Sequence, residues 1–309
     1  MLTKPARRRG FTLIEILVVI SLIAVLAALS VGALFRVRAA QQTSNTEGTL
    51  GKLDTLMMAR WSAVLTKAKN PPPEVISYCD GDKERAVSVW TYAVLKNEFP
   101  VSFAELVAIN INGANLEPRT VFTKGVKAKA IVASLKDTEE SAALFYAAIM
   151  DTGTAGTANT LEGLQQQVAT TPSGLTVFND NWGREIVFIR HATNAEIQGP
   201  PHSKPSAGGF KNPLDPRGLL LTNAWANRVN AAKGLMGNMV TGFQSTPPPD
   251  KFILLQVNTI TGFQTENFIP TLISAGPDKD FGTALGGAAG DSGNDNLLSY
   301  RRREGTRRD

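Results

Sequence analysis

The chain has very little of the residues from which disulfides and metal centres are most often built. Among 309 residues there is one cysteine, Cys79, and there are two histidines, His191 and His202. A single cysteine excludes an internal disulfide framework and a zinc site made of several thiolates. Two histidines exclude a three-histidine metal centre. Charged residues are only 19% and hydrophobic residues 43%, which excludes a disordered chain and a multi-span membrane protein.

Acidic residues are scarce where the basic ones gather. The net charge is +5, but residues 1–10 carry four basic residues and no acid, and their removal would leave +1. Residues 301–309 hold five arginines against two acids, so the body between the two ends is slightly negative. The excess of basic residues therefore lies in the two short ends of the chain and not in the body. For this reason we predict no nucleic-acid partner. For the arginine-rich tail two interpretations stay open: a solvated terminus, and a site for an anionic partner.

A run of about twenty residues, 16–35, has no charge at all. As a helix it would span roughly 30 Å, the hydrocarbon thickness of a bilayer. It is longer than the roughly 7–15 apolar residues of a secretory signal. Arginines 7–9 precede the run, and only Arg36 and Arg38 follow it closely. This asymmetry predicts a single-pass membrane protein with a cytoplasmic N-terminus and a body outside the cytoplasmic membrane.

Glu15 is an acid inside this apolar stretch. A lone carboxylate at the bilayer centre costs roughly 2.5–3.5 kcal/mol on insertion scales, so it needs either an interfacial position or a partner. A cut after Gly10 would give Phe11 a free α-amine, four residues from Glu15. The amine of one subunit and the carboxylate of its neighbour could neutralise each other in lipid. Such a pair would set the axial register of subunits in an assembly.

These residues carry a resemblance to a known family. RRRG followed by FTLIEILVVISLIAVLAAL, residues 7–29, resembles the cleavage and methylation signal of type IV pilins and type II secretion pseudopilins. The resemblance implies that prepilin peptidase cuts between Gly10 and Phe11 and methylates the Phe11 amine. It also places Glu15 at the family's acidic position, where it pairs with the N-terminus during assembly.

The resemblance implies a structural subunit rather than an enzyme, with no catalytic residues. It would be assembled into a type II secretion pseudopilus or a type IV pilus, along the shaft or as a minor subunit at the tip. Its partners would be prepilin peptidase, other subunits, an inner-membrane assembly platform and, before assembly, the membrane itself. The alternative is a signal-anchored periplasmic binding protein or enzyme that is not assembled into filaments.

The patterns beyond the apolar run predict an α+β fold, with a long N-terminal helix and a body of further helices and a small antiparallel sheet. The pilin family's fold is similar. In chain order we expect a leader (1–10), a transmembrane and assembly helix (11–35), an amphipathic continuation (36–69), a mainly helical insertion-like region (70–170), an antiparallel-sheet region ending in an Asp/Gly loop (171–300) and the arginine-rich tail (301–309).

The spacing of apolar residues, together with prolines, glycines and capping residues, predicts the helices and strands within these regions. An apolar stripe from Leu50 to Leu65 continues the first helix, which must end before Pro71. Two glycines weaken the helix at 44–51, where we expect a kink or a melted turn. Further helices are predicted at 84–109, with an interruption at Pro100 and a restart capped by Ser102, at 137–150, capped by Asp137 or Thr138, and at 219–240. Strands are predicted at 176–178 and 186–189, which form a hairpin, and at 252–257 and 270–274.

Residues 274–300 are rich in glycine and aspartate. Calcium takes 6–8 oxygen ligands, and glycines allow the tight turns that direct them inward. Spacing alone leaves a solvated acidic loop as one interpretation. Major pseudopilins have a similar Ser-x-Gly-x-Asp loop that binds calcium, which Ser274, Gly276 and Asp278 match, while the later acids match less closely. The resemblance thus implies calcium as a candidate ligand, with no other cofactor required, at Asp278, Asp280, Asp291 and Asp295.

Overall fold

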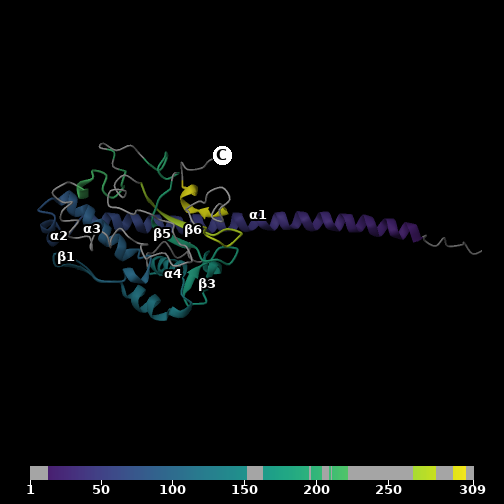
Figure 1. Ribbon diagram of the computed structural model, residues 1–309, viewed down its shortest axis with the longest axis horizontal. Helices are drawn as coiled ribbons and strands as arrows, with labels where there is room; N and C mark the ends of the chain where they lie inside the picture. The colour runs from purple at the N-terminus through teal and green to yellow at the C-terminus, as the bar shows by residue number, and fades with distance from the viewer. Residues whose placement is uncertain are drawn as a thin grey trace, which may run out of the picture. The chain divides into compact units, whose positions relative to one another are not determined.

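The computed structural model describes residues 13–151, 163–194, 196–203, 209, 211–221, 267–282 and 295–303. Within these ranges the chain has the predicted α+β fold: a long N-terminal helix followed by shorter helices and small antiparallel sheets (Figure 1). Internal contacts divide the chain into residues 1–45 and residues 46–309, with the boundary inside the first helix. The strand predicted at 252–257 and most of the helix predicted at 219–240 lie outside the described residues.

Helix α1 (Leu13–Ala68) is one continuous helix of 56 residues, which runs from purple into blue in Figure 1. Its second half carries the predicted stripe, with Leu50, Leu53 and Met57 fully buried, and it ends before the prolines as predicted. The helix is unbroken through 44–51, so the melted turn, one of the two alternatives predicted there, is wrong. Each glycine there costs about 1 kcal/mol relative to alanine, but the burial of two leucines, about 1.5–3 kcal/mol each, outweighs that cost.

Three shorter helices follow: α2 (Pro73–Tyr78), α3 (Lys83–Glu98) and α4 (Asp137–Met150). α4 has the predicted bounds. α3 is shorter than predicted, because it ends at Glu98, two residues before Pro100. The predicted restart forms only the short 3₁₀ turn η1 (Phe103–Glu105), and the Ser102 side chain does not cap it.

The predicted caps of α4 are also wrong. The N-cap position is Lys136, which makes no side-chain cap bond. Thr138 instead donates its hydroxyl proton to Glu185 Oε1, at 2.6 Å, and Glu139 accepts a bond from Ser173. Both residues of the first turn are buried. The Thr138 side chain, which the local sequence predicts as a helix cap, therefore makes a tertiary contact instead.

The strands form three antiparallel sheets: β1 (Ile109–Ile111) with β2 (Ala114–Leu116), β3 (Val168–Thr170) with β4 (Thr176–Phe178), and a third sheet in the order β5 (Val187–Ala192), β6 (Ile269–Ser274), β7 (Leu297–Leu298). In the third sheet Val187 pairs with Ile273, and Ile273 pairs with Leu298. The strands predicted at 176–178 and 270–274 are confirmed, and the one at 186–189 begins one residue later and runs on to Ala192.

The predicted hairpin between β4 and β5 is present as a short ladder. Asn179 and Glu185 form an antiparallel bridge, and Ile186 N–H donates to Phe178 O at 2.7 Å. Beyond that bridge the two strands part, because β4 pairs with β3 and β5 pairs with β6. The connection thus joins two sheets instead of closing one.

Stacked aromatic side chains connect the helices to the sheets. The Trp61 ring of α1 lies 5.4 Å from the ring of Phe99, which lies 5.6 Å from Phe188 of β5. Phe188 in turn stacks on Phe145 of α4 at 5.3 Å, and Phe145 meets Phe178 of β4 edge-on. Aromatic pairs of this kind contribute about 0.5–1.5 kcal/mol each beyond their burial. They make α1, α4 and the strands of two sheets parts of one core.

Candidate assembly site

The first part of α1 is apolar around its whole circumference. Every large apolar side chain from Leu13 to Val37 is at least 48% exposed. The helix is long and apolar enough to cross a membrane. Its most apolar stretch of 18 residues has a mean hydropathy of 2.8, and no residue of that stretch is buried. A helix that is apolar on all sides has to be covered on all sides. Lipid or other apolar helices can provide that cover.

Polar side chains within this part of the helix find partners on the helix itself. The Ser21 hydroxyl donates to Val18 O, and the Ser30 hydroxyl donates to Leu26 O, both at 2.8 Å. Hydroxyls bonded to the preceding turn do not need water, so they can enter an apolar environment at low cost. Both serines are therefore compatible with burial in lipid or in a bundle of helices.

Glu15 lies in the first turn of α1 and is exposed. The free amide groups at a helix N-terminus carry partial positive charge, which favours a carboxylate at this position. Gly10 and Phe11, the predicted cleavage and methylation residues, lie outside the described residues.

Residues 5–31 match the family model described as the prokaryotic N-terminal methylation motif. The chain carries the signature of prepilin-like proteins. The matched range includes Gly10, Phe11 and Glu15 and most of the exposed apolar helix. No curated protein and no solved structure matches the chain. The motif and the apolar helix together fit a membrane-anchored, pilin-like protein.

The loop between β4 and β5 bonds to α1. Asp180 of this loop is buried; its Oδ1 accepts the N–H groups of Trp182 and Arg184 at 2.9 Å, and its Oδ2 accepts the Ser274 hydroxyl at 2.7 Å. Burial raises the pKa of Asp180, and these bonds oppose the rise. Asn181 donates its backbone and side-chain N–H groups to the hydroxyl of Thr46 on α1. One aspartate thereby orders the loop against both α1 and β6.

The described part of the Asp/Gly loop brings three of the four predicted calcium ligands close together. Asp278 N–H donates to Asp295 Oδ2 at 3.4 Å, and Asp280 N–H donates to Asp278 Oδ1 at 2.9 Å. Asp291 lies outside the described residues. Among those that are described, no group of three or more His, Cys, Asp or Glu is placed to hold a metal ion. Here the carboxylates serve as acceptors for loop amides, and calcium stays a prediction.

The start of the arginine-rich tail is held by ion pairs: Arg301 and Arg302 are exposed to solvent as one interpretation expects, whereas Arg303 is half-buried. Arg303 donates to both carboxylate oxygens of Asp54, at 2.8 and 2.9 Å, and to Pro270 O at 2.6 Å. Arg301 pairs with Glu196 and Arg302 with Glu47. The sequence did not predict this contact between Arg303 and Asp54, which we call the latch, although Asp54 interrupts the buried apolar stripe of α1. A buried acid in such a stripe requires a partner.

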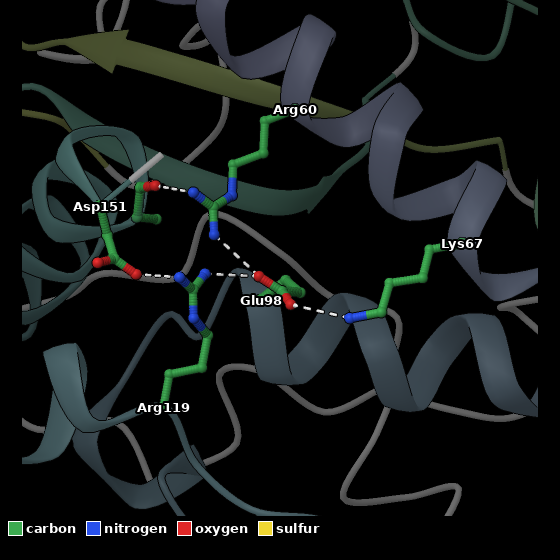
Figure 2. A network of polar contacts seen from close by, with 6 residues as sticks. Arg60, Lys67, Glu98, Arg119 and Asp151 are labelled. Carbon is green, nitrogen blue, oxygen red and sulfur yellow. Dashed lines mark hydrogen bonds and ion pairs between the residues drawn. The ribbon is translucent and has the colours of Figure 1, made fainter. Parts of the chain in front are cut away.

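A second polar network ties α1 to the insertion-like region (Figure 2). Glu98 Oε2 accepts Arg60 Nη2 at 2.8 Å and Arg119 Nη1 at 2.6 Å, and Lys67 lies 3.9 Å from Oε1. Arg119 also bonds Asp151, just past the end of α4. Burial raises the pKa of Glu98, and Lys67 opposes the rise. The network fixes the relative positions of α1, α3 and α4.

Proposed function

We propose that this prepilin-like protein is a structural subunit of a type II secretion pseudopilus or a type IV pilus. Prepilin peptidase cuts it between Gly10 and Phe11 and methylates the new amine. The observation that supports this is the methylation motif at residues 5–31, which leads into a helix that is apolar on all sides. Such a helix suits two environments in turn: lipid before assembly and a bundle of like helices afterwards.

The proposed role of Glu15 is electrostatic. In a helix bundle the effective dielectric is low, so the attraction between its carboxylate and the Phe11 amine of a neighbour is far stronger than in water. Either charge left alone in that environment is costly. Only a subunit placed at the correct axial height satisfies both groups, and the pair therefore selects one register.

The orientation and partners follow from the same proposal. The arginines before the helix keep the N-terminus in the cytoplasm, and the body from residue 46 onward lies in the periplasm. Other subunits and an inner-membrane assembly platform are the partners, besides the peptidase. The large body is easier to accommodate at the tip of a filament than along a tight helical lattice, so we favour a minor, tip-located subunit.

The experiment is the Glu15→Ala substitution in the native host. We expect the variant to be inserted and cleaved as the wild type is, but to enter sheared filaments or pseudopili at least tenfold less. Glu15→Asp, which keeps the charge, is the matched control and should retain part of the assembly. A normal yield of assembled Glu15→Ala protein refutes the pairing.

We also propose that the loop containing Asp278, Asp280, Asp291 and Asp295 binds calcium. The support is the Ser274–Asp278 pattern and the approach of Asp278 to Asp295. Calorimetric titration of the full chain in detergent micelles should give saturable heat with calcium, and Asp278→Asn should abolish it. No heat at millimolar calcium would remove this part of the proposal and leave assembly untouched.

A further inference from the structure

A groove of about 330 Å³ lies on the body, away from the amino-terminal motif. One wall is the π-helical turn η2 (Val121–Val126) with the 3₁₀ turn η3 (Lys127–Lys129), and the other is the turn that joins β3 to β4. The C-terminal half of α4 contributes the remaining residues. π-Helical turns are rare and are frequently found at functional sites. The side chains that line the groove are mainly apolar: Val121, Val126, Tyr146, Ala147, Met150 and Leu175.

Apolar side chains also stand exposed at the groove and beside it. Met150 is 43% exposed and Ile131 is 55% exposed, unlike most large apolar residues of the body. The backbone of Ile131 is held beside the groove, because its N–H donates to Ser173 O at 2.8 Å. Exposed apolar side chains beside an apolar groove are typical of a binding surface.

The segment that forms one wall of the groove carries charge of one sign. The segment 119–136 carries five basic residues and no acid. Lys124, Lys127 and Lys129 are exposed. Lys127 donates to Phe103 O at 3.5 Å and interacts with Glu140; burial raises the pKa of Glu140, and Lys127 opposes the rise. Within the described ranges Lys124 and Lys129 form no ion pair with a carboxylate. Lys129 itself lines the groove. Two exposed lysines of this kind favour an anionic partner.

The acidic residue that lines the groove, Asp151, is already neutralised. It bonds Arg119, which also bonds Glu98 in the network of Figure 2. That network sets three cations, Arg60, Lys67 and Arg119, against two carboxylates. An incoming anion therefore meets a net positive charge at this end of the groove as well.

We propose that this groove binds an acidic peptide segment of another protein, with one apolar side chain seated between η2 and α4 and its carboxylates along Lys124 and Lys129. The groove is at the small end of ligand sites, about the size for one or two side chains. A nucleic acid would use the lysines but leave the apolar groove empty. The inference does not rest on filament assembly.

The test measures the binding of a fluorescein-labelled peptide, Glu-Glu-Leu-Glu-Glu, to the full chain in dodecyl maltoside micelles by fluorescence anisotropy at low salt. The comparison peptide, Glu-Glu-Ser-Glu-Glu, lacks the apolar side chain. We expect the leucine peptide to bind at least fivefold more tightly than the serine peptide. Lys129→Glu should weaken its binding at least tenfold, whereas the exposed Lys83→Glu at the start of α3 should leave it unchanged.

Two variants test the groove itself. A Cβ on Gly125 would make only an ordinary contact with Val121, at 3.7 Å, so Gly125→Leu should fold and fill the groove. Met150→Glu changes an exposed side chain and repels the peptide. Both should remove the preference for leucine over serine.

Equal binding of the two peptides by the wild type overturns the proposal. So does a DNA duplex that binds as tightly as the peptide and is indifferent to Gly125→Leu. Cleavage and methylation at the N-terminus are expected in every variant, so failure here is distinct from failure of the assembly proposal.

Discussion

Asp54 is an acidic residue among the apolar positions that α1 turns toward the core. It is 7% exposed, so its charge has lost most of its hydration. Arg303 and Ser299 restore the lost bonds: two from the guanidinium and one from the hydroxyl. A partly buried, bidentate pair of this kind is worth far more than a surface pair, because removal of one partner leaves the other charge uncompensated. The latch holds the C-terminal end of the described chain against α1.

This latch can be measured. Arg303→Ala should lower the free energy of unfolding by about 3 kcal/mol, since it leaves Asp54 buried without its cation. Arg302→Ala is the matched control, because its pair with Glu47 is more than a third exposed on both sides and should contribute under about 1 kcal/mol. Denaturant unfolding followed by tryptophan fluorescence compares the two. Equal losses would show that Arg303 acts as a surface charge only.

His191 gives the body a pH dependence. It is buried between the rings of Tyr92 and Phe268, and burial lowers its pKa well below the ordinary value, with Arg190 adding to the effect. The native state therefore keeps it neutral, while the unfolded chain takes up a proton as the pH falls below about 6.5. Stability should fall toward low pH by up to about 1.4 kcal/mol per pH unit from this group.

The check is urea unfolding of the wild type and of His191→Phe between pH 5 and pH 8. The phenylalanine ring has nearly the same shape but no proton to bind, so the variant's stability curve should be flatter below pH 6.5. Parallel curves for the two proteins would assign the pH dependence to other groups.

At the scale of elements, two turns show what a glycine contributes. Gly276 and Gly183 both have positive φ, +74° and +82°. A Cβ on Gly276 would lie 2.6 Å from Asp295 O and 3.1 Å from its side chain, whereas a Cβ on Gly183 would meet nothing within 4 Å. The first glycine is needed for conformation and for space, the second for conformation alone.

We therefore expect Gly183→Ala to cost about 1–2 kcal/mol of stability, the price of a left-handed alanine, and Gly276→Ala to cost clearly more. In addition, Gly276→Ala should push the 276 turn away from Asp295, which weakens any calcium binding there. Thermal unfolding with and without calcium checks both points. An equal loss in the two variants would mean that the loop moves aside freely.

The elements that sequence predicted correctly are those whose pattern is long or sharply bounded. The apolar run, the stripe of α1 and the bounds of α4 are of this kind, because burial and proline decide them. The hairpin of β1 and β2 was missed, although its Asn112-Gly113 turn, with φ of +51° and +98°, is a strong hairpin signal. Strands of three residues are too short to show a clear alternation of apolar and polar residues, so the sequence did not predict them.

Partnerships between distant side chains could not be predicted from pattern. The caps of α4 failed because Thr138 bonds Glu185, 47 residues away. The pair of Glu105 with Arg190, 85 residues apart and almost fully buried, has no local signature either. The site residues Gly10, Phe11 and Glu15 could be proposed because a contiguous motif carries them, whereas the acids of the Asp/Gly loop come together only through the fold.

At the scale of the whole molecule, the chain joins two parts with opposite solvent requirements. Residues 13–37 expose apolar side chains on every side, which water does not tolerate, while the body buries its own core and needs no cover. A protein of this kind is stable only where lipid or other copies surround the helix. The prepilin-type motif supplies the same conclusion from the sequence. The proposed sequence of membrane anchoring and then assembly would cover the helix at each stage.

The measurement that tests this account most directly is the intact mass and N-terminal sequence of the protein extracted from its native membrane. We predict a chain that begins at Phe11 with one methyl group on its amine. A chain that begins at Met1, or one cut beyond residue 35, would contradict the account. The body would then belong to an anchored or secreted protein that is not assembled through this helix.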